Sequence, residues 1–269
     1  MWNRPAVDFV TTKLLPWQPI GPDHLGGTET GLKQVLSRDP EDGAETAVVR
    51  VTSPIVGTVT SAVDLYVVSG SATLNGTPMP ASAFVHVPAG AGIELTPDIA
   101  PIVLYMGSFG TPGLDVETGT RDEVEIIDVD NLPWTDMGWR GDEEPNPAVK
   151  IKWLRQDETL GTAFVVAMLP GWRAPMEENH PVYEESFKLY GDFLLGRRGI
   201  VRPGGYFFRP PLSWHGPLYS RTGNMSIIRK NAFGSTDYRE PAEGHDLDTL
   251  IADAYRNLPA PSVPEAVAW

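Results

Sequence analysis

Two histidines and one glutamate in the second half of the chain have the residue types and spacing of metal ligands. His180 and Glu184 are four residues apart, and His215 follows later in the chain. Two imidazoles and one carboxylate can form a facial triad that leaves coordination positions open, which suits non-haem Fe(II). The alternative is that the two histidines are unrelated surface residues.

The local sequence must bend for these side chains to meet. His180 and Glu184 have the same parity along an extended segment, so both could face the interior. A straight strand would keep them about 13 Å apart, at roughly 3.3 Å per residue. Metal–ligand bonds of about 2.0–2.2 Å cannot span that gap. We therefore expect a turn, and Pro181 directly after His180 is the expected turn residue.

Short apolar runs bounded by Gly, Pro, Asn and Asp must position these residues. They are rich in β-branched and aromatic residues, which predicts strands, and many short strands predict a sandwich, jelly roll or barrel. The predicted strands cover residues 46–51, 65–68, 84–87, 102–106, 163–169, 186–190, 205–208 and 226–229. One segment, 246–258, has helical periodicity after the N-cap residue Asp246. The expected fold is all-β with one short C-terminal helix.

The chain repeats itself with a period of about 120 residues, too long for a solenoid unit and right for a duplicated domain. The tripeptide "LPW" at 15–17 recurs at 132–134, and "DLYVVSG" ending at Gly70 matches "ESFKLYG" ending at Gly191. Pro88 likewise matches Pro210. We place the boundary in the turn-rich stretch 111–120 and expect domains at residues 1–115 and 120–269.

The spacing around the candidate ligands resembles the two sequence motifs of the cupin superfamily. Six residues separate Glu184 from Gly191, five separate Gly204 from Pro210, and His215 lies five beyond that proline. With the duplication, the chain resembles a bicupin, which implies two tandem cupin domains, that is, double-stranded β-helices or jelly rolls. The runs "LPW" and "VLSRDPEDGAETAVVR" also resemble ChrR-like cupins and small cupin dioxygenases that cleave diketones or aryl ketones.

Glu178 stands where many cupins carry the first histidine of a His-x-His pair. As a ligand it would give a two-histidine, two-carboxylate site, which would also suit Mn(II). It could instead hydrogen-bond the ligands, or face solvent beside Glu177. We favour the ligand role because Glu178 shares strand parity with His180.

The first copy carries no ligand at the matching positions. Counted from the matched glycines and prolines, the four candidates Glu178, His180, Glu184 and His215 correspond to Gly57, Val59, Val63 and Ile93. We therefore expect a metal-free N-terminal domain and one divalent metal per chain in the C-terminal domain. Fe(II) is favoured, and Mn, Zn or Ni are possible.

Around the metal we expect an apolar, partly aromatic pocket for a small-molecule substrate. Lys188 and Tyr190 share the parity of Glu184 and are the candidate catalytic residues. Lys188 could hold a substrate carboxylate or enolate, or it could form an ion pair with a glutamate, and either residue could handle a proton. The candidate pocket walls are Trp172, Phe193, Phe208 and Trp214.

These residues and the resemblance together predict an Fe(II) dioxygenase acting on a small organic, diketone- or aryl-ketone-like substrate. The alternatives are a metal-dependent isomerase, lyase or decarboxylase, and a non-catalytic regulator that senses a ligand. Against the regulator, the chain lacks the cysteine-rich zinc-binding segment of an anti-sigma factor, because it contains no cysteine.

Composition excludes several other classes. Acidic residues number 35 and basic residues 21, a net charge of −14, so nucleic acids and anionic membranes are poor partners. No run of 18 apolar residues predicts a membrane span. Residues 1–15 lack the basic-then-apolar pattern of a secretory signal. We expect a cytoplasmic homodimer.

Overall fold

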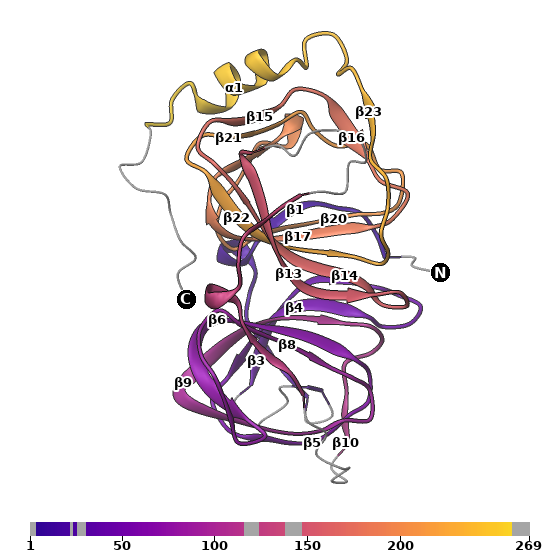
Figure 1. Ribbon diagram of the computed structural model, residues 1–269, viewed down its shortest axis with the longest axis vertical. Helices are drawn as coiled ribbons and strands as arrows, with labels where there is room; N and C mark the ends of the chain where they lie inside the picture. The colour runs from indigo at the N-terminus through magenta and orange to yellow at the C-terminus, as the bar shows by residue number, and fades with distance from the viewer. Residues whose placement is uncertain (1–3, 22–23, 26–30, 116–123, 138–146, 260–269) are drawn as a thin grey trace. The chain divides into compact units, whose positions relative to one another are not determined.

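The computed structural model describes residues 4–21, 24–25, 31–115, 124–137 and 147–259 and divides them into two compact units (Figure 1). The first unit takes in residues 4–5 and 12–132, and the second takes in 6–11 and 133–259. The boundary was predicted within residues 111–120, of which 116–120 lie outside the described residues. Both units are built from antiparallel strands, and the described residues contain one α-helix, which confirms the all-β prediction.

The main sheet of the first unit follows the order β11-β8-β6-β9-β4-β3-β2. Strands β5 and β7 pair with β9 and β6, and β10 pairs with β5. The strands are β2 (Gln18–Pro19), β3 (Leu32–Arg38), β4 (Glu45–Val51), β5 (Ile55–Val59), β6 (Val63–Leu74), β7 (Thr77–Met79), β8 (Ala83–Val87), β9 (Gly92–Ser108), β10 (Leu114–Asp115) and β11 (Ile126–Asp128), with 3-10 turns η1 (Thr12–Leu14) and η2 (Val129–Asn131).

The second unit repeats this strand order as β1-β20-β17-β22-β14-β13-β12, with smaller sheets β15-β21-β18-β19 and β16-β23 (Figure 1). The strands are β1 (Val7–Thr11), β12 (Thr135–Asp136), β13 (Val149–Asp157), β14 (Gly161–Met168), β15 (Trp172–Ala174), β16 (Glu177–Asn179), β17 (Glu184–Gly191), β18 (Phe193–Leu195), β19 (Ile200–Val201), β20 (Gly205–Arg209), β21 (Leu218–Ser220), β22 (Asn224–Lys230) and β23 (Asp237–Arg239), with 3-10 turn η3 (Gly196–Arg198).

The two interiors differ in their side chains. The core of the first unit is aliphatic and includes Val59, Val63 and Ile93. The core of the second unit contains aromatic rings, among them Trp172, Phe193 and Phe207. Each unit therefore buries an apolar interior of its own, as a jelly roll requires.

A bulge and a glycine interrupt β17 at the place where it leaves the main sheet. The pairing of β17 with β22 shifts register between Lys188 and Tyr190. At Gly191 the backbone has φ +74, and a Cβ there would lie 1.8 Å from the carbonyl oxygen of Gly223. Only glycine fits this combination of positive φ and close backbone approach, which explains the motif glycine.

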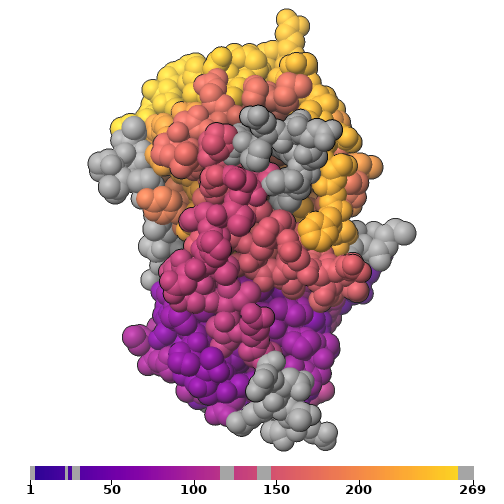
Figure 2. Space-filling view, in the orientation of Figure 1, coloured from indigo at the N-terminus to yellow at the C-terminus, as the bar shows by residue number. Residues whose placement is uncertain are grey.

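Helix α1 (Leu247–Tyr255) confirms the predicted C-terminal helix. Asp246 caps it by accepting a hydrogen bond from the Thr249 backbone N–H at 3.0 Å. Tyr255 packs edge-on against Tyr219 of β21, with ring centroids 5.7 Å apart. The helix and the segment before it form a continuous outer surface of the second unit, coloured yellow in Figure 2.

Candidate metal centre

Two backbone segments hold Glu178 and His215 opposite each other. The Glu178 N–H donates to the His215 carbonyl at 2.8 Å, and the His215 N–H donates to the Glu178 carbonyl at 2.9 Å. The Leu212 N–H donates to the His180 carbonyl at 2.7 Å. The segment that carries Glu178 and His180 is therefore paired with the segment that carries His215.

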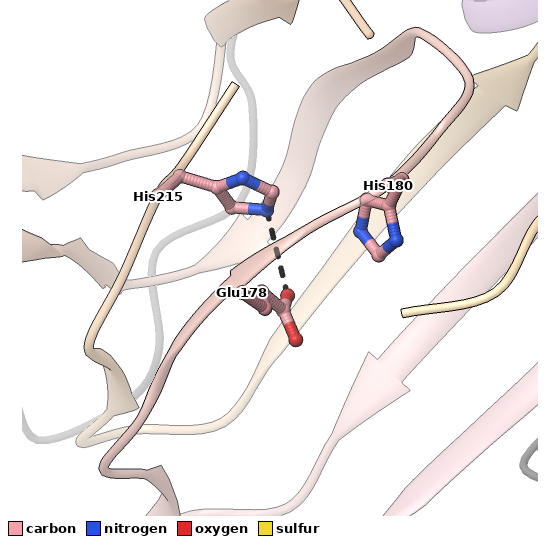
Figure 3. Close-up of side chains that lie close together, drawn as sticks. All are labelled: Glu178, His180 and His215. Atoms are coloured by element: carbon pink, nitrogen blue, oxygen red, sulfur yellow. Dashed lines mark ion pairs between the residues drawn. The ribbon is translucent and has the colours of Figure 1, made fainter. Parts of the chain in front are cut away.

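The side chains of Glu178, His180 and His215 converge at this pairing. One ligand atom of each residue lies within 4.8 Å of the others, as a single metal ion requires (Figure 3). Nε2 of His215 lies 3.5 Å from Oε1 of Glu178, and the imidazole centroids are 5.5 Å apart. His180 is 6% exposed and His215 2% exposed, so the two imidazoles are shielded from water, while the Glu178 side chain is 15% exposed.

The outer nitrogen of each imidazole is already engaged. Nδ1 of His215 lies 3.0 Å from the Ser213 carbonyl, and Nδ1 of His180 lies within hydrogen-bond distance of the Ser235 carbonyl and the Thr236 hydroxyl. Both Nε2 atoms are buried and face carboxylate oxygens, with Oε2 of Glu184 at 3.2 Å from His180 and Oε1 of Glu178 at 3.5 Å from His215. Contacts to Nδ1 orient metal-binding imidazoles, as they do here, so that Nε2 points toward the carboxylates. The two Nε2 atoms therefore fit a metal ion.

Glu184 lies beside this cluster at the start of β17. The chain bends at Pro181 and Val182, where a turn was predicted, and brings Oε2 of Glu184 to 3.2 Å from Nε2 of His180. The same oxygen lies 2.6 Å from Nζ of Lys230. The structure thus groups Glu178 with the two histidines and places Glu184 next to them, in an ion pair with a lysine.

Charge interactions shift the pKa values of these groups. Burial raises the pKa of Glu178, but the contact with His215 outweighs it, so the pKa is lowered overall. Burial also opposes ionisation of Glu184, but Lys230 and His180 hold its pKa well below the usual range. Burial lowers the pKa of His215, and Glu178 and Glu184 more than reverse this, so it is raised. Both carboxylates are therefore ionised at neutral pH.

The two predicted catalytic residues lie in different surroundings. Lys188 is 2% exposed and donates to Oδ1 of Asn224 at 2.7 Å and to Oγ of Ser226 at 2.6 Å. Its ammonium lies over the Phe193 ring, 4.3 Å from the centroid. Burial in this apolar site lowers the pKa of Lys188 well below its usual range. The side chain is thus tied to β22 and β18 inside the second unit.

Strand parity predicted that Tyr190 would face the interior, but it does not. It is 37% exposed, because the register shift after Lys188 breaks the alternation of side chains along β17. Glu185 has the opposite strand parity to Glu184, yet it too is buried, and it receives hydrogen bonds of 2.5 Å from Arg229 and Tyr206.

Among the predicted pocket walls, Trp172 and Phe193 stack in the core of the second unit, with ring centroids 6.5 Å apart. Phe207 occupies this core, while Phe208 packs against Tyr183. Trp214 lies instead in an outer pocket of about 730 Å³, under the guanidinium of Arg239.

Two buried cations flank Glu184: sequence reasoning favoured a surface position for Arg209, which is 3% exposed, and it missed Lys230. In the sheet, Glu184 is directly opposite Arg209 of β20 on one side and Lys230 of β22 on the other. The signal was available, because both residues end apolar strand runs. Arg209 is turned toward β1, where it donates to the carbonyls of Val7 and Asp8 at 2.8 Å. Burial and the nearby Arg198 lower the pKa of Arg209 to about 10.

The first unit pairs Gly57 with Ile93 where the second unit pairs Glu178 with His215. Val59 and Val63 stand in for His180 and Glu184, and both are fully buried in the aliphatic core. These four positions carry no group that binds a metal. His86 of this unit is engaged elsewhere, with Nδ1 2.8 Å from Oδ1 of Asp64.

Comparison with known proteins identifies the family and the fold. Residues 27–233 match the family described as "Domain of unknown function (DUF4437)", so the chain belongs to this family. No curated protein matches the chain significantly. No helix among the described residues has the length and apolar character needed to cross a membrane.

Solved cupin-fold structures resemble most of the chain. A candidate dioxygenase from Nostoc punctiforme is 18% identical, with a TM-score of 0.74 and coverage of 89% of this chain and 88% of its own. An oxalate decarboxylase from Lactobacillus farciminis is 10% identical, with a TM-score of 0.58 and 93% coverage of both chains. The 7S globulin of Momordica charantia is 12% identical, with a TM-score of 0.57 and 94% and 92% coverage. The fold is therefore that of a tandem cupin.

Proposed function

We propose that this protein is a metal-dependent cupin enzyme, and specifically a non-haem Fe(II) dioxygenase acting on a small organic, diketone- or aryl-ketone-like substrate. The observation that carries the proposal is the convergence of Glu178, His180 and His215, with two buried Nε2 atoms directed at carboxylate oxygens. Two imidazoles and a carboxylate with open coordination positions suit Fe(II) and dioxygen chemistry.

The side chains at the site would have separate roles. Nε2 of His180, Nε2 of His215 and a Glu178 oxygen would hold the metal, and Ser213, Ser235 and Thr236 would fix the two rings through Nδ1. When bound, iron would supply a Lewis acid and a site at which substrate oxygens and O₂ meet. Burial of the imidazoles would keep bulk water from the reacting groups.

A metal-dependent decarboxylase is the second candidate, because the site contains a second carboxylate, Glu184, beside the cluster. Two carboxylates and two imidazoles make a harder donor set that suits Mn(II). The likeness to oxalate decarboxylases supports this candidate at the level of the fold.

Metal analysis and oxygen uptake separate these candidates. Protein purified without a histidine tag is analysed for metals, then reconstituted with Fe(II) or Mn(II) and mixed with diketones, aryl ketones and small carboxylic acids. If the protein is a dioxygenase, the Fe(II)-reconstituted protein should consume O₂, and His215→Ala should abolish that consumption. Turnover of an acid without O₂ uptake would favour the decarboxylase, and absence of bound metal would contradict both.

A further inference from the structure

Lys230 contacts Glu184 beside the metal cluster, and the proposed chemistry does not use it. Lys230 is 7% exposed, and its Nζ lies 2.6 Å from Oε2 of Glu184. That oxygen also lies 3.2 Å from Nε2 of His180, so a single atom links the lysine to a nitrogen that faces the metal position. Lys230 therefore belongs to the surroundings of any ligand that binds there.

The fold itself does not require this ion pair. By strand register, Glu184, Arg209 and Lys230 correspond to Val63, Val87 and Ser108 of the first unit. The first unit closes the same three-strand arrangement with uncharged side chains, at no cost of burying charge. The lysine is present where the metal-ligating residue types are present, which points to a role at the site.

The charges around the cluster do not cancel. Glu178 and Glu184 contribute two negative charges and Lys230 one positive charge. A divalent metal with neutral imidazoles would then leave one net positive charge in a buried site. Arg209 does not reverse the sign of this balance, because its nearest carboxylate, Asp8 at 3.5 Å, also pairs with Arg198 at 2.5 Å, so the arginines add positive charge. A net charge in a low-dielectric site is stabilised by a ligand of opposite charge.

We propose that Lys230 makes this site selective for a small monoanion with oxygen donors, an enolate or a carboxylate. The inference rests on the proposed function, since it assumes a divalent metal at Glu178, His180 and His215. Without the lysine, two carboxylates would balance the metal, and the site would favour a neutral ligand. Lys230 is thus a specificity-determining residue.

The test uses the full chain reconstituted with Co(II), whose visible spectrum reports ligand binding. Acetylacetone is the enolate probe, acetate the carboxylate probe and imidazole the neutral probe. We expect at least one monoanion to bind the wild-type protein. Lys230→Met should weaken that binding by about 10–100-fold, the range for residues that act through a metal ligand. In Lys230→Met, imidazole affinity should stay within about twofold of wild type. Lys230→Arg should still bind the anion.

Controls keep the outcomes distinct. Lys152→Met removes another buried lysine of the second unit and should change neither affinity. Lys230→Gln replaces Lys230→Met if the latter fails to fold. Three results would overturn the inference and leave the proposed function standing. These are an anion affinity of Lys230→Met or Lys230→Gln within twofold of wild type, an equal weakening of imidazole binding in that variant, and no anion binding by the wild-type Co(II) protein. Failure of wild-type protein to bind Co(II) or Fe(II) would instead overturn the proposed function.

Discussion

The two units share a strand order and differ in what they enclose. The order β8-β6-β9-β4-β3-β2 of the first unit recurs as β20-β17-β22-β14-β13-β12 in the second. Even the register shift in β17 after Lys188 has a counterpart in β6 after Val67. The backbone plan is therefore independent of the chemistry inside it.

The difference between the units lies at a few positions. Gly57 and Ile93 become Glu178 and His215, while Val63 becomes Glu184. The first unit gains stability from a continuous aliphatic core, whereas the second buries ionised carboxylates beside imidazoles. One copy of the fold serves stability, and the other accepts a cost that a bound metal would offset.

The largest effects should come from two matched substitutions. One removes an imidazole of the second unit, and the other truncates its counterpart in the first unit. His215→Ala should weaken metal binding by more than about 100-fold, beyond the range for residues that only contact a ligand. Ile93→Ala should cost about 2–5 kcal/mol of stability, as for other buried isoleucines, and leave metal affinity unchanged. Calorimetric metal titration and urea unfolding measure the two quantities. Loss of metal from Ile93→Ala would break the proposed division between the units.

The next effect separates the two glutamates. Glu178→Gln should lower metal affinity strongly, because an amide oxygen is a poorer partner than a carboxylate for a divalent cation. Glu184→Gln should lower it less, by about 10–100-fold, because Glu184 lies beside the cluster. Metal titration of both variants shows which substitution lowers the metal affinity more. An affinity of Glu178→Gln within twofold of wild type would remove Glu178 from the ligand set.

Metal binding should also depend on pH. The pKa of His215 in the metal-free protein is raised above its usual 6.5, so a metal must displace a proton at lower pH. Affinity should fall by about tenfold per unit as pH decreases below that raised pKa. The pKa values of Glu178 and Glu184 are lowered, so they add no slope near neutrality. A flat profile between pH 5 and pH 8 in metal titrations would contradict protonation of His215.

Through this histidine, the stability of the metal-free protein depends on pH in the opposite direction to metal affinity. A raised pKa in the folded state adds stability that is fully present below the unfolded value and lost as pH rises through the folded value. His215→Ala removes this dependence, whereas Ile93→Ala keeps it. Urea unfolding of the metal-free proteins across this pH range measures it.

The smallest effect should be confined to stability. Val59→Ala and Val63→Ala remove buried methyl groups from the first unit and should cost about 0.5–3 kcal/mol each. Metal content should stay at the wild-type value, and urea unfolding should give the cost. Metal loss in either variant, with the protein still folded, would show that the first unit takes part in the site.

Sequence reasoning anticipated the strands, the single helix and the bend at Pro181, because β-branched runs, turn residues and motif spacing are local signals. It could not anticipate Tyr190, since one extra residue at a bulge reverses side-chain parity. It also missed the pairing of Glu184 with Lys230, because residues far apart in the sequence meet only through strand register.

The location of the metal tests the account most directly. Crystals of the protein reconstituted with Fe(II) are measured at the iron absorption edge, and anomalous scattering locates the metal. The account predicts one peak per chain, at bonding distances of about 2.0–2.2 Å from Nε2 of His180, Nε2 of His215 and a Glu178 oxygen. A peak elsewhere, a second peak among the residues of the first unit, or no peak at all would contradict it.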